Sequence, residues 1–310
     1  MRGGLSLRPT YYEALRRLTL QLAGVQMGSD HAFLVETRLS QLARKEGYET
    51  LDAMIEDLFA VGQARLAVHV VSALVERDTH FNRDPASLDA LFDTALPDLV
   101  EKRGGGRIDL LSYGCGSGQD LYSIAIRARH AAARAMLAPV DLHLKGVDYP
   151  SQALERARTG RYTHFEIQRG LSARDMIAHF TPDPVADSTD WLAAAHLRET
   201  VKFQDMHLLS GTQEAEAFHV VLFRGAIGQY GHAARIRVIR TLAKLLRPHG
   251  YLVTGSDEDL GEIHPGLEKV ESAPGLYRRR VVQQEPAPVI GKPPPGRTTF
   301  EPPVARRAHG

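Results

Sequence analysis

The hydrophobic residues up to about residue 90 follow a helical spacing. Apolar side chains recur among charged ones in two runs, Leu34, Leu39, Leu42 and Ala43, then Leu51, Met54, Ile55 and Leu58. Side chains at these intervals lie on one face of a helix, and no strictly alternating stretch indicates a strand. The pattern predicts a helical N-terminal domain with a linker over residues 1–90.

Beyond that point, short apolar runs alternate with amphipathic stretches. We predict strands near residues 108–113, 142–147, 219–223 and 251–255, and helices near 119–137, 151–157 and 233–246. Strands that alternate with helices are typical of a parallel, doubly wound sheet. The fold class is therefore predicted as α/β, with this domain spanning residues 91–284.

Two segments depart from the alternation. Residues 160–200 are polar and rich in turn formers, which predicts an inserted subdomain. Seven of the 17 prolines fall between Pro286 and Pro303. Such a stretch does not form a packed core, so we predict a disordered or extended tail over residues 285–310.

Charge and composition exclude several function classes. The net charge is +1, from 38 basic and 37 acidic side chains, so we expect no nucleic-acid partner. The longest apolar stretch, Leu66–Val75, is about half of a membrane span, and no apolar export segment opens the chain. We expect no membrane insertion and a cytoplasmic protein. One cysteine, and 14 histidines without H-x-x-x-H or H-E-x-x-H spacing, predict no metal site.

A glycine-rich loop joins the first predicted strand to the helix that follows it. The loop reads Gly114-Cys-Gly116-Ser-Gly118, and Asp148 ends the next strand. Glycines let the backbone approach a ligand, and a carboxylate at the end of the second strand can accept both hydroxyls of a ribose. The pattern indicates a cofactor that contains adenosine, although a tight turn without a ligand remains an alternative.

The loop favours S-adenosylmethionine over other adenosine cofactors. Gln119 and Asp120 follow Gly118 without the later glycine of the dinucleotide fingerprint, and no Walker lysine follows. S-adenosylmethionine has no pyrophosphate and needs only the loop and the ribose acid. Cys115 has no histidine beside it in the motif, so we interpret it as a small apolar filler rather than a nucleophile.

These segments resemble the CheR-type chemoreceptor glutamate methyltransferases. Residues 79–85 are similar to the family's T-x-F-F-R-E-P linker, and residues 112–125 to its S-A-x-C-S-x-G-E-E-P-Y-S-I-A loop. Residues 147–148 match the family's ribose acid, and residues 153–162 match its L-x-x-A-R-x-G-x-Y helix. Residues 201–208 take the place of V-x-F-x-x-x-N-L, and residues 245–252 resemble L-L-x-P-G-G-Y-L.

The resemblance implies a class I methyltransferase with a helical N-terminal domain and a small antiparallel insertion within residues 160–205. It implies methyl transfer from S-adenosylmethionine to a glutamate of a receptor-like partner protein, with S-adenosylhomocysteine as the product. At the matched positions it implies cofactor contacts by Thr79, Arg83 and Asp148. We predict further cofactor contacts by Gly114, Cys115, Gly116, Gly118, Gln119, His207, Leu208 and Arg224. We predict that Arg83 and Tyr230 are the catalytic residues.

Several positions depart from the family pattern at this site. The family has asparagine at the positions of Arg77, His207 and Gly225, and glutamate at the position of Gln119. Gln229 stands where the family has tyrosine, and Tyr230 follows one residue later. These changes leave the methyl acceptor open.

A carboxylate acceptor is ionised at neutral pH and needs alignment and exclusion of water rather than a general base. The planar guanidinium of Arg83 suits that orienting role. An amine or hydroxyl acceptor, in a small molecule or another side chain, requires a base, for which His80 or His207 are the candidates. A third alternative is a module that binds the cofactor without turnover.

The basic residues of the N-terminal helices do not by themselves indicate a docking face. Arg38, Arg44 and Lys45 are interleaved with Glu36 and Glu46, which is typical of a solvated amphipathic helix.

Overall fold

The structure is a computed structural model that describes residues 7–28, 31–60, 63–75, 79–134, 140–185, 188–206, 217–260 and 264–280. The tail predicted over residues 285–310 lies outside these residues. Among the residues described, no helix is both long and apolar enough to cross a membrane.

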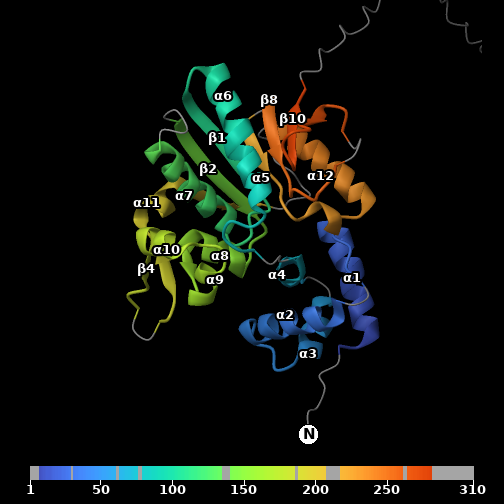
Figure 1. Cartoon of the computed structure of the whole chain (residues 1–310). Helices are drawn as coiled ribbons and strands as arrows, with labels where there is room; N and C mark the ends of the chain where they lie inside the picture. Colours follow the sequence, from blue (N-terminus) through green and yellow to red (C-terminus); the bar gives the residue numbers. More distant parts are fainter. Residues whose placement is uncertain are drawn as a thin grey trace, which may run out of the picture.

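Four helices form the N-terminal part of the chain (Figure 1). They are α1 (Pro9–Ala23), α2 (Ala32–Lys45), α3 (Leu51–Leu58) and α4 (Ala64–Val75). Leu39, Met54, Ile55 and Val70 are fully buried in their shared core. Leu34 is 43% exposed, because the adjacent Val35 takes the inward position on α2 instead.

A mixed seven-stranded sheet forms the larger part, in the order β6-β2-β1-β7-β8-β10-β9. Its strands are β1 (Gly106–Tyr113), β2 (Val140–Asp148), β6 (Val201–Asp205), β7 (Phe218–Leu222), β8 (Leu246–Val253), β9 (Leu267–Lys269) and β10 (Leu276–Arg279). The first five pair in parallel, while β10 is antiparallel to β8 and β9. The predicted doubly wound α/β fold is confirmed.

Helices cover both faces of this sheet (Figure 1). They are α5 (Pro85–Ala90), which continues through a π-helical turn (Leu91–Ala95) into α6 (Leu96–Arg103), then α7 (Gln119–Ala133), α8 (Gln152–Thr159), α11 (Ala195–Thr200) and α12 (His232–Leu245). Because side chains alternate along a strand, Leu110 of β1 packs on the side of α6 and α7 and Leu111 on the side of α12. Both sides of β1 are therefore buried, as its apolar run predicts.

A three-stranded antiparallel sheet is inserted between α8 and β6. It has the order β3-β5-β4 and consists of β3 (Arg161–Tyr162), β4 (Phe180–Pro182) and β5 (Trp191–Ala193), accompanied by α9 (His164–Gln168) and α10 (Ala173–His179). The insertion expected within residues 160–205 ends earlier, because Val201–Asp205 pairs in parallel with β2 as part of the main sheet.

Candidate functional site

The glycine loop runs along the carboxyl edge of the main sheet between β1 and α7. The backbone N–H groups of Gly114 and Cys115 both donate to the carbonyl oxygen of Val147, at 2.8 and 3.0 Å, which ties the loop to β2. Gly114, Gly116 and Gly118 have φ values of 77°, 54° and 79°, in the left-handed region that favours glycine. A Cβ on Gly118 would lie 2.7 Å from Cζ of Phe203, so both the conformation and the packing require glycine there.

Thr79, in the segment that links the two parts of the chain, lies directly over this loop. Its Oγ1 donates to Oε1 of Gln119 at 2.7 Å and lies 2.6 Å from Oγ of Ser117. Ser117 also donates to Oε1 of Gln119, at 2.9 Å. Gln119 is 1% exposed, and its buried Nε2 has no hydrogen-bond acceptor among the residues that the structure describes. This donor is available to a ligand seated on the loop.

Asp148 is held beside the loop at the end of β2. Its Oδ2 accepts a hydrogen bond from the backbone N–H of Gly116 at 2.6 Å, and its Oδ1 accepts one from that of Tyr149 at 2.7 Å. Both contacts fix the orientation of the half-buried carboxylate. The predicted loop residues, the linker threonine and the ribose acid are thus brought together at one edge of the sheet.

The linker beyond Thr79 has an unusual backbone that side chains hold in place. Asn82 and Asp84 have φ values of 50° and 46°, which are rare for residues with a side chain. The N–H of Asn82 donates to Oγ of Ser123 at 2.9 Å. The carboxylate of Asp84 accepts hydrogen bonds from the N–H and Oγ of Ser256, at 2.7 and 2.6 Å. These contacts fix the path of the chain past the glycine loop.

Arg224, which is among the predicted cofactor contacts, anchors the linker through its side chain. It is 5% exposed, and its Nη1 lies 2.7 Å from Oδ1 of Asp120. Its Nη2 donates to the carbonyl oxygens of Arg83 and Asp84, and its Nε donates to Oγ of Ser87 at 3.0 Å. The guanidinium therefore binds protein groups on all three of its nitrogens.

Arg83 lies against the same loop as Arg224. Its Nη2 donates to the carbonyl oxygen of Arg224 at 2.9 Å and lies 3.6 Å from Oδ2 of Asp120. A Cβ on Gly225 would lie 2.6 Å from Nη1 of Arg83. The glycine at position 225, where the family has asparagine, thus leaves the space that the guanidinium fills.

Tyr230, the second predicted catalytic residue, belongs to a buried aromatic cluster. It is 5% exposed, its ring centroid lies 5.8 Å from that of Phe223, and its backbone forms a β-bridge with Val25. Burial, followed by the proximity of Tyr230, raises the pKa of Tyr113 in this cluster. Gln229 accepts a hydrogen bond from the N–H of Gln26 at 2.7 Å. This segment therefore joins the N-terminal helices to the sheet.

Five further residues were singled out at the site from the sequence, and the structure describes two of them. Arg77, His207 and Leu208 lie outside the described residues. His80 is half-buried in the linker, one residue after Thr79. Cys115 is buried in the core beside the sheet, as expected of a small apolar filler.

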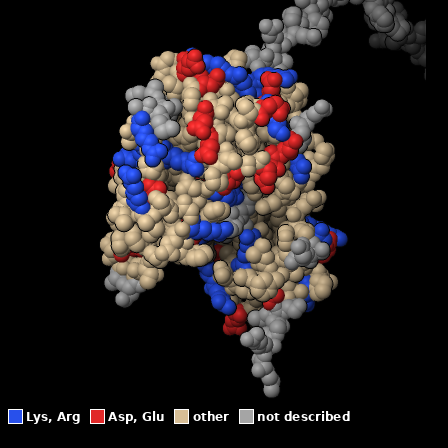
Figure 2. Space-filling view, viewed as in Figure 1, with Lys and Arg blue, Asp and Glu red and all other residues tan. Residues whose placement is uncertain are grey.

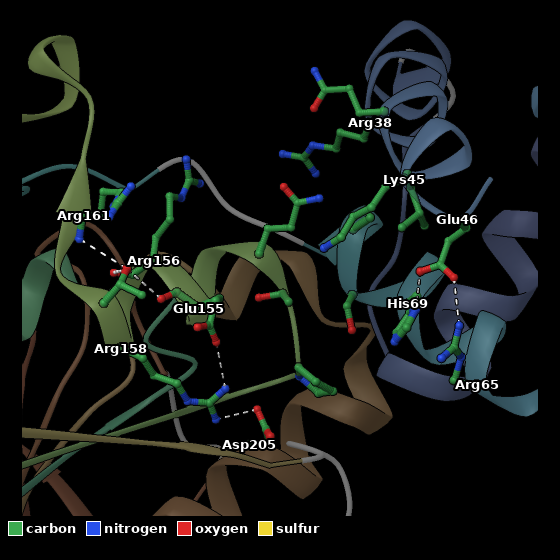
Figure 3. Close-up of a pocket in the computed structure, with 18 residues that line it drawn as sticks. Arg38, Lys45, Glu46, Arg65, His69, Glu155, Arg156, Arg158, Arg161 and Asp205 are labelled. Carbon is green, nitrogen blue, oxygen red and sulfur yellow. Dashed lines mark hydrogen bonds and ion pairs between the residues drawn. The ribbon is translucent and has the colours of Figure 1, made fainter. Parts of the chain in front are cut away.

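A cleft of about 970 Å³ opens beyond the end of β2, between α2 and α4 on one side and α8 on the other (Figure 3). Its wall includes Pro150, Ser151 and Gln152, which follow Asp148 and Tyr149 directly. Six basic side chains line it, Arg38, Lys45, Arg65, Arg156, Arg158 and Arg161, against three acidic ones, Glu46, Glu155 and Asp205. Figure 2 shows Lys and Arg side chains bordering the notch between the N-terminal helices and the rest of the molecule.

Four of the six basic side chains have an acidic partner among the residues that the structure describes. Arg156 lies 3.2 Å from Glu166 and Arg161 lies 2.8 Å from Asp183, two acids outside the cleft lining. Arg158 lies 2.7 Å from Asp205, and Glu46 contacts both Arg65 and His69, at 3.1 and 2.8 Å. Sequence reasoning missed this cleft because its two walls come from segments far apart in the chain. Within a single stretch of sequence, only the closely spaced Arg156, Arg158 and Arg161 indicated a basic surface there.

Sequence comparison agrees with this geometry. A family profile described as "CheR methyltransferase, SAM binding domain" matches residues 77–275, from the linker to the last strands of the sheet. The chain belongs to the CheR methyltransferase family.

Curated relatives of this CheR family member match most of its length. "Chemotaxis protein methyltransferase Cher2" of Pseudomonas putida is 25% identical over 267 residues, which cover 86% of this chain and 96% of that protein. "Chemotaxis protein methyltransferase 1" of Pseudomonas aeruginosa is 24% identical, covering 86% and 97%. "Chemotaxis protein methyltransferase" of Vibrio parahaemolyticus is also 24% identical, covering 86% and 94%.

The chain is an S-adenosylmethionine-dependent methyltransferase, and its residues fit that cofactor. The oriented carboxylate of Asp148 suits the hydroxyls of a ribose. The unmatched Nε2 of Gln119 is a donor that suits an oxygen acceptor such as the carboxylate of the methionine part. Gly116, which is half-buried, lies in the loop between these two groups.

Proposed function

We propose that this methyltransferase esterifies glutamate side chains of a partner protein. Membership of the CheR family and relatives named as chemotaxis methyltransferases support a protein acceptor of the chemoreceptor class. The basic cleft beside the cofactor edge is the observation that carries the proposal, because a segment rich in glutamate is the ligand that it complements.

The chemistry requires little of the protein beyond alignment. S-adenosylmethionine supplies a methyl group activated by its positively charged sulfur. One oxygen of the glutamate carboxylate forms the new bond to the methyl carbon while the carbon–sulfur bond breaks, and the electron pair of that bond stays on sulfur. No proton is transferred, so the site needs to align the reacting atoms and exclude water.

Arg83 is the residue that we propose to orient the acceptor. Its side chain is 19% exposed, and only Nη2 takes part in the contacts described above. The guanidinium has five N–H donors in a fixed plane, which leaves donors for a carboxylate. Arg83 lies beside Gly225, in the same linker whose Thr79 crosses the glycine loop, so it would bring the acceptor to the cofactor edge of the sheet.

Reversing one charge of the cleft tests the proposed docking of an acidic segment. Lys45→Glu replaces an exposed cation of the cleft wall, so the KM for a glutamate-rich acceptor should rise about tenfold at low salt. The dissociation constant for S-adenosylmethionine should not change, because Lys45 lies on α2, away from the glycine loop.

Lys244→Glu is the matched control, since it makes the same charge change at an exposed position of α12. The two variants are compared by acceptor titration at two salt concentrations. Equal KM values for both variants would contradict docking in the cleft.

A further inference from the structure

Four side chains with metal-binding chemistry meet where the inserted subdomain packs against the main domain. His130 comes from α7, Asp175 and His179 from α10, and His196 from α11. Nε2 of His130 lies 3.1 Å from Oδ1 of Asp175, and Nδ1 of His179 lies 3.1 Å from Nε2 of His196. His130, Asp175 and His179 each offer one potential ligand atom, and these three atoms lie within 4.8 Å of one another.

We propose that His130, Asp175 and His179 bind a divalent transition metal ion, Zn²⁺ by the nature of the donors. Two imidazoles and one carboxylate are a ligand set that Zn²⁺ takes in proteins, with a water molecule in the fourth position. Ligand bonds of about 2.0–2.2 Å place neighbouring donors of a tetrahedral site about 3.3–3.5 Å apart. The donors already approach this spacing, and small side-chain rotations complete it.

Asp175 is prepared for a ligand by its surroundings. Its Oδ2 accepts a hydrogen bond from Oγ of Ser172 at 2.8 Å, which fixes the carboxylate at the start of α10. Its Oδ1 is buried; Nε2 of His130 lies 3.1 Å away, but no group in the described part of the chain donates a hydrogen bond to it. A buried carboxylate oxygen left in this state is costly, and a cation at this position would satisfy it.

His179 follows Asp175 by one helical turn, so both side chains lie on the same face of α10. It is 6% exposed, and burial followed by the neighbouring His196 lowers its pKa, which favours the neutral ring that binds metals. His196 then has the position of the hydrogen-bond partner that commonly fixes the ring of a metal-binding histidine.

The site would join the insertion to the helix that begins at the glycine loop. His130 lies eleven residues after Gln119, which is about 16 Å along α7. A metal ion there takes no part in methyl transfer. Its effect would be to hold α10, and with it the small antiparallel sheet, in a fixed position relative to the cofactor edge.

Zinc binding by the metal-free full-length protein, measured by calorimetry with Zn²⁺ alone, tests the proposal. We expect one Zn²⁺ per chain, a rise in the unfolding midpoint, and with Co²⁺ the visible absorption of a low-symmetry site. His130→Ala changes a half-exposed ligand and should weaken binding at least about tenfold. Asp175→Asn should do the same, and it provides a second measurement if one variant folds poorly.

His143→Ala is the matched control, because His143 forms an equivalent exposed pair with Asp141, 2.8 Å apart, outside the cluster. Its affinity for Zn²⁺ should equal that of the unchanged protein. Absence of stoichiometric binding by the unchanged protein would overturn the proposal. So would binding that His130→Ala and Asp175→Asn leave intact, or that His143→Ala weakens equally.

Discussion

Arg83 and Gly225 form a matched pair at the centre of the site. The guanidinium of Arg83 fills the space that a side chain at position 225 would occupy, and Nη2 donates to the carbonyl oxygen of Arg224. A side chain at position 225 would compete with the guanidinium for this space, so the residue at position 225 and the placement of Arg83 depend on each other. The replacement at position 225 therefore has to be interpreted together with the position of Arg83.

Replacement of Arg83 by alanine tests its proposed role. We expect the methyl-transfer rate to fall about 100-fold, the scale of losing one oriented donor in an active site, while the thermal midpoint changes little. Arg127→Ala is the control, because Arg127 also anchors the linker, through Oδ1 of Asn82 at 3.1 Å, but from α7. Near-normal transfer in Arg83→Ala, or an equal loss in both variants, would contradict an orienting role.

The sequence predicted where the glycine loop and Asp148 lie in the fold, but not every contact around them. Gly114, Gly116 and Asp148 meet because a strand, a turn and a helix in succession determine their positions locally. Arg224 and Tyr230 could not be assigned in this way. Their surroundings depend on the linker and on α1, segments that are distant in the chain and that no local pattern connects to them.

Close packing between elements explains why the loop tolerates few changes. A Cβ on Gly118 would lie 2.7 Å from Cζ of Phe203 on β6 and 2.8 Å from Cβ of Ala157 on α8. The start of α7 thus lies directly against two elements that follow it in the chain. This contact also brings β6 into the main sheet, although its residues were expected to belong to the insertion.

Gly118→Ala should therefore destabilise the protein more than backbone conformation alone requires. Gly104→Ala is the control, since Gly104 has a similar φ of 66° and no described atom within 4 Å of an added Cβ. We expect the control to lose about 1–2 kcal/mol of unfolding free energy, and Gly118→Ala to lose about 1–3 kcal/mol more through overpacking. Urea unfolding measures both free energies. Equal losses in the two variants would show that the contacts with Phe203 and Ala157 do not restrict the residue at position 118.

Helices and strands were predicted more reliably than their boundaries. The Ser151 hydroxyl accepts a hydrogen bond from the N–H of Leu154 and starts α8, as the sequence indicated. Helix α7 ends at Ala133, four residues before its predicted end, since the alanine-rich pattern there contains no stop signal. The candidate metal site was missed for a related reason, because its ligands are adjacent only once α7 and α10 pack together.

At the scale of the whole molecule, the N-terminal helices provide one wall of the cleft, which their charge pattern alone did not predict. The alternation of acids and bases on α2 indicated a solvated face, yet Arg38, Lys45 and Glu46 line the cleft opposite α8. Figure 3 shows Arg38 and Lys45 facing the arginines of the methyltransferase domain across the cleft, while Glu46 contacts His69 and Arg65 on its own wall. Only the packing of two domains makes this surface continuous.

The stability of the whole protein should depend on pH through His219 at the opposite edge of the sheet. Its Nδ1 accepts a hydrogen bond from the N–H of Asp109 at 3.0 Å. Burial, and then Arg103 and Arg247, lower its pKa to about 4. Between pH 6.5 and 4 the unfolded chain therefore binds a proton that the folded protein does not, and stability falls as the pH falls.

Urea unfolding at pH 7 and pH 5 measures this effect. His219 should contribute about 2 kcal/mol to the decrease in unfolding free energy between these values. His219→Gln keeps an acceptor for the N–H of Asp109 but does not titrate, so the decrease should be smaller by that amount. An unchanged decrease in this variant would mean that His219 does not remain neutral in the folded protein.

The most direct test of the central proposal is the chemical form of the transferred methyl group. The protein is incubated with methyl-labelled S-adenosylmethionine and the cytoplasmic domains of candidate chemoreceptors, and the labelled protein is treated with alkali. We predict that the label is released as methanol, because a glutamate methyl ester hydrolyses in base, and that peptide mapping assigns it to glutamates. Label that resists alkali, or that appears on a small molecule instead of a protein, would contradict glutamate methylation.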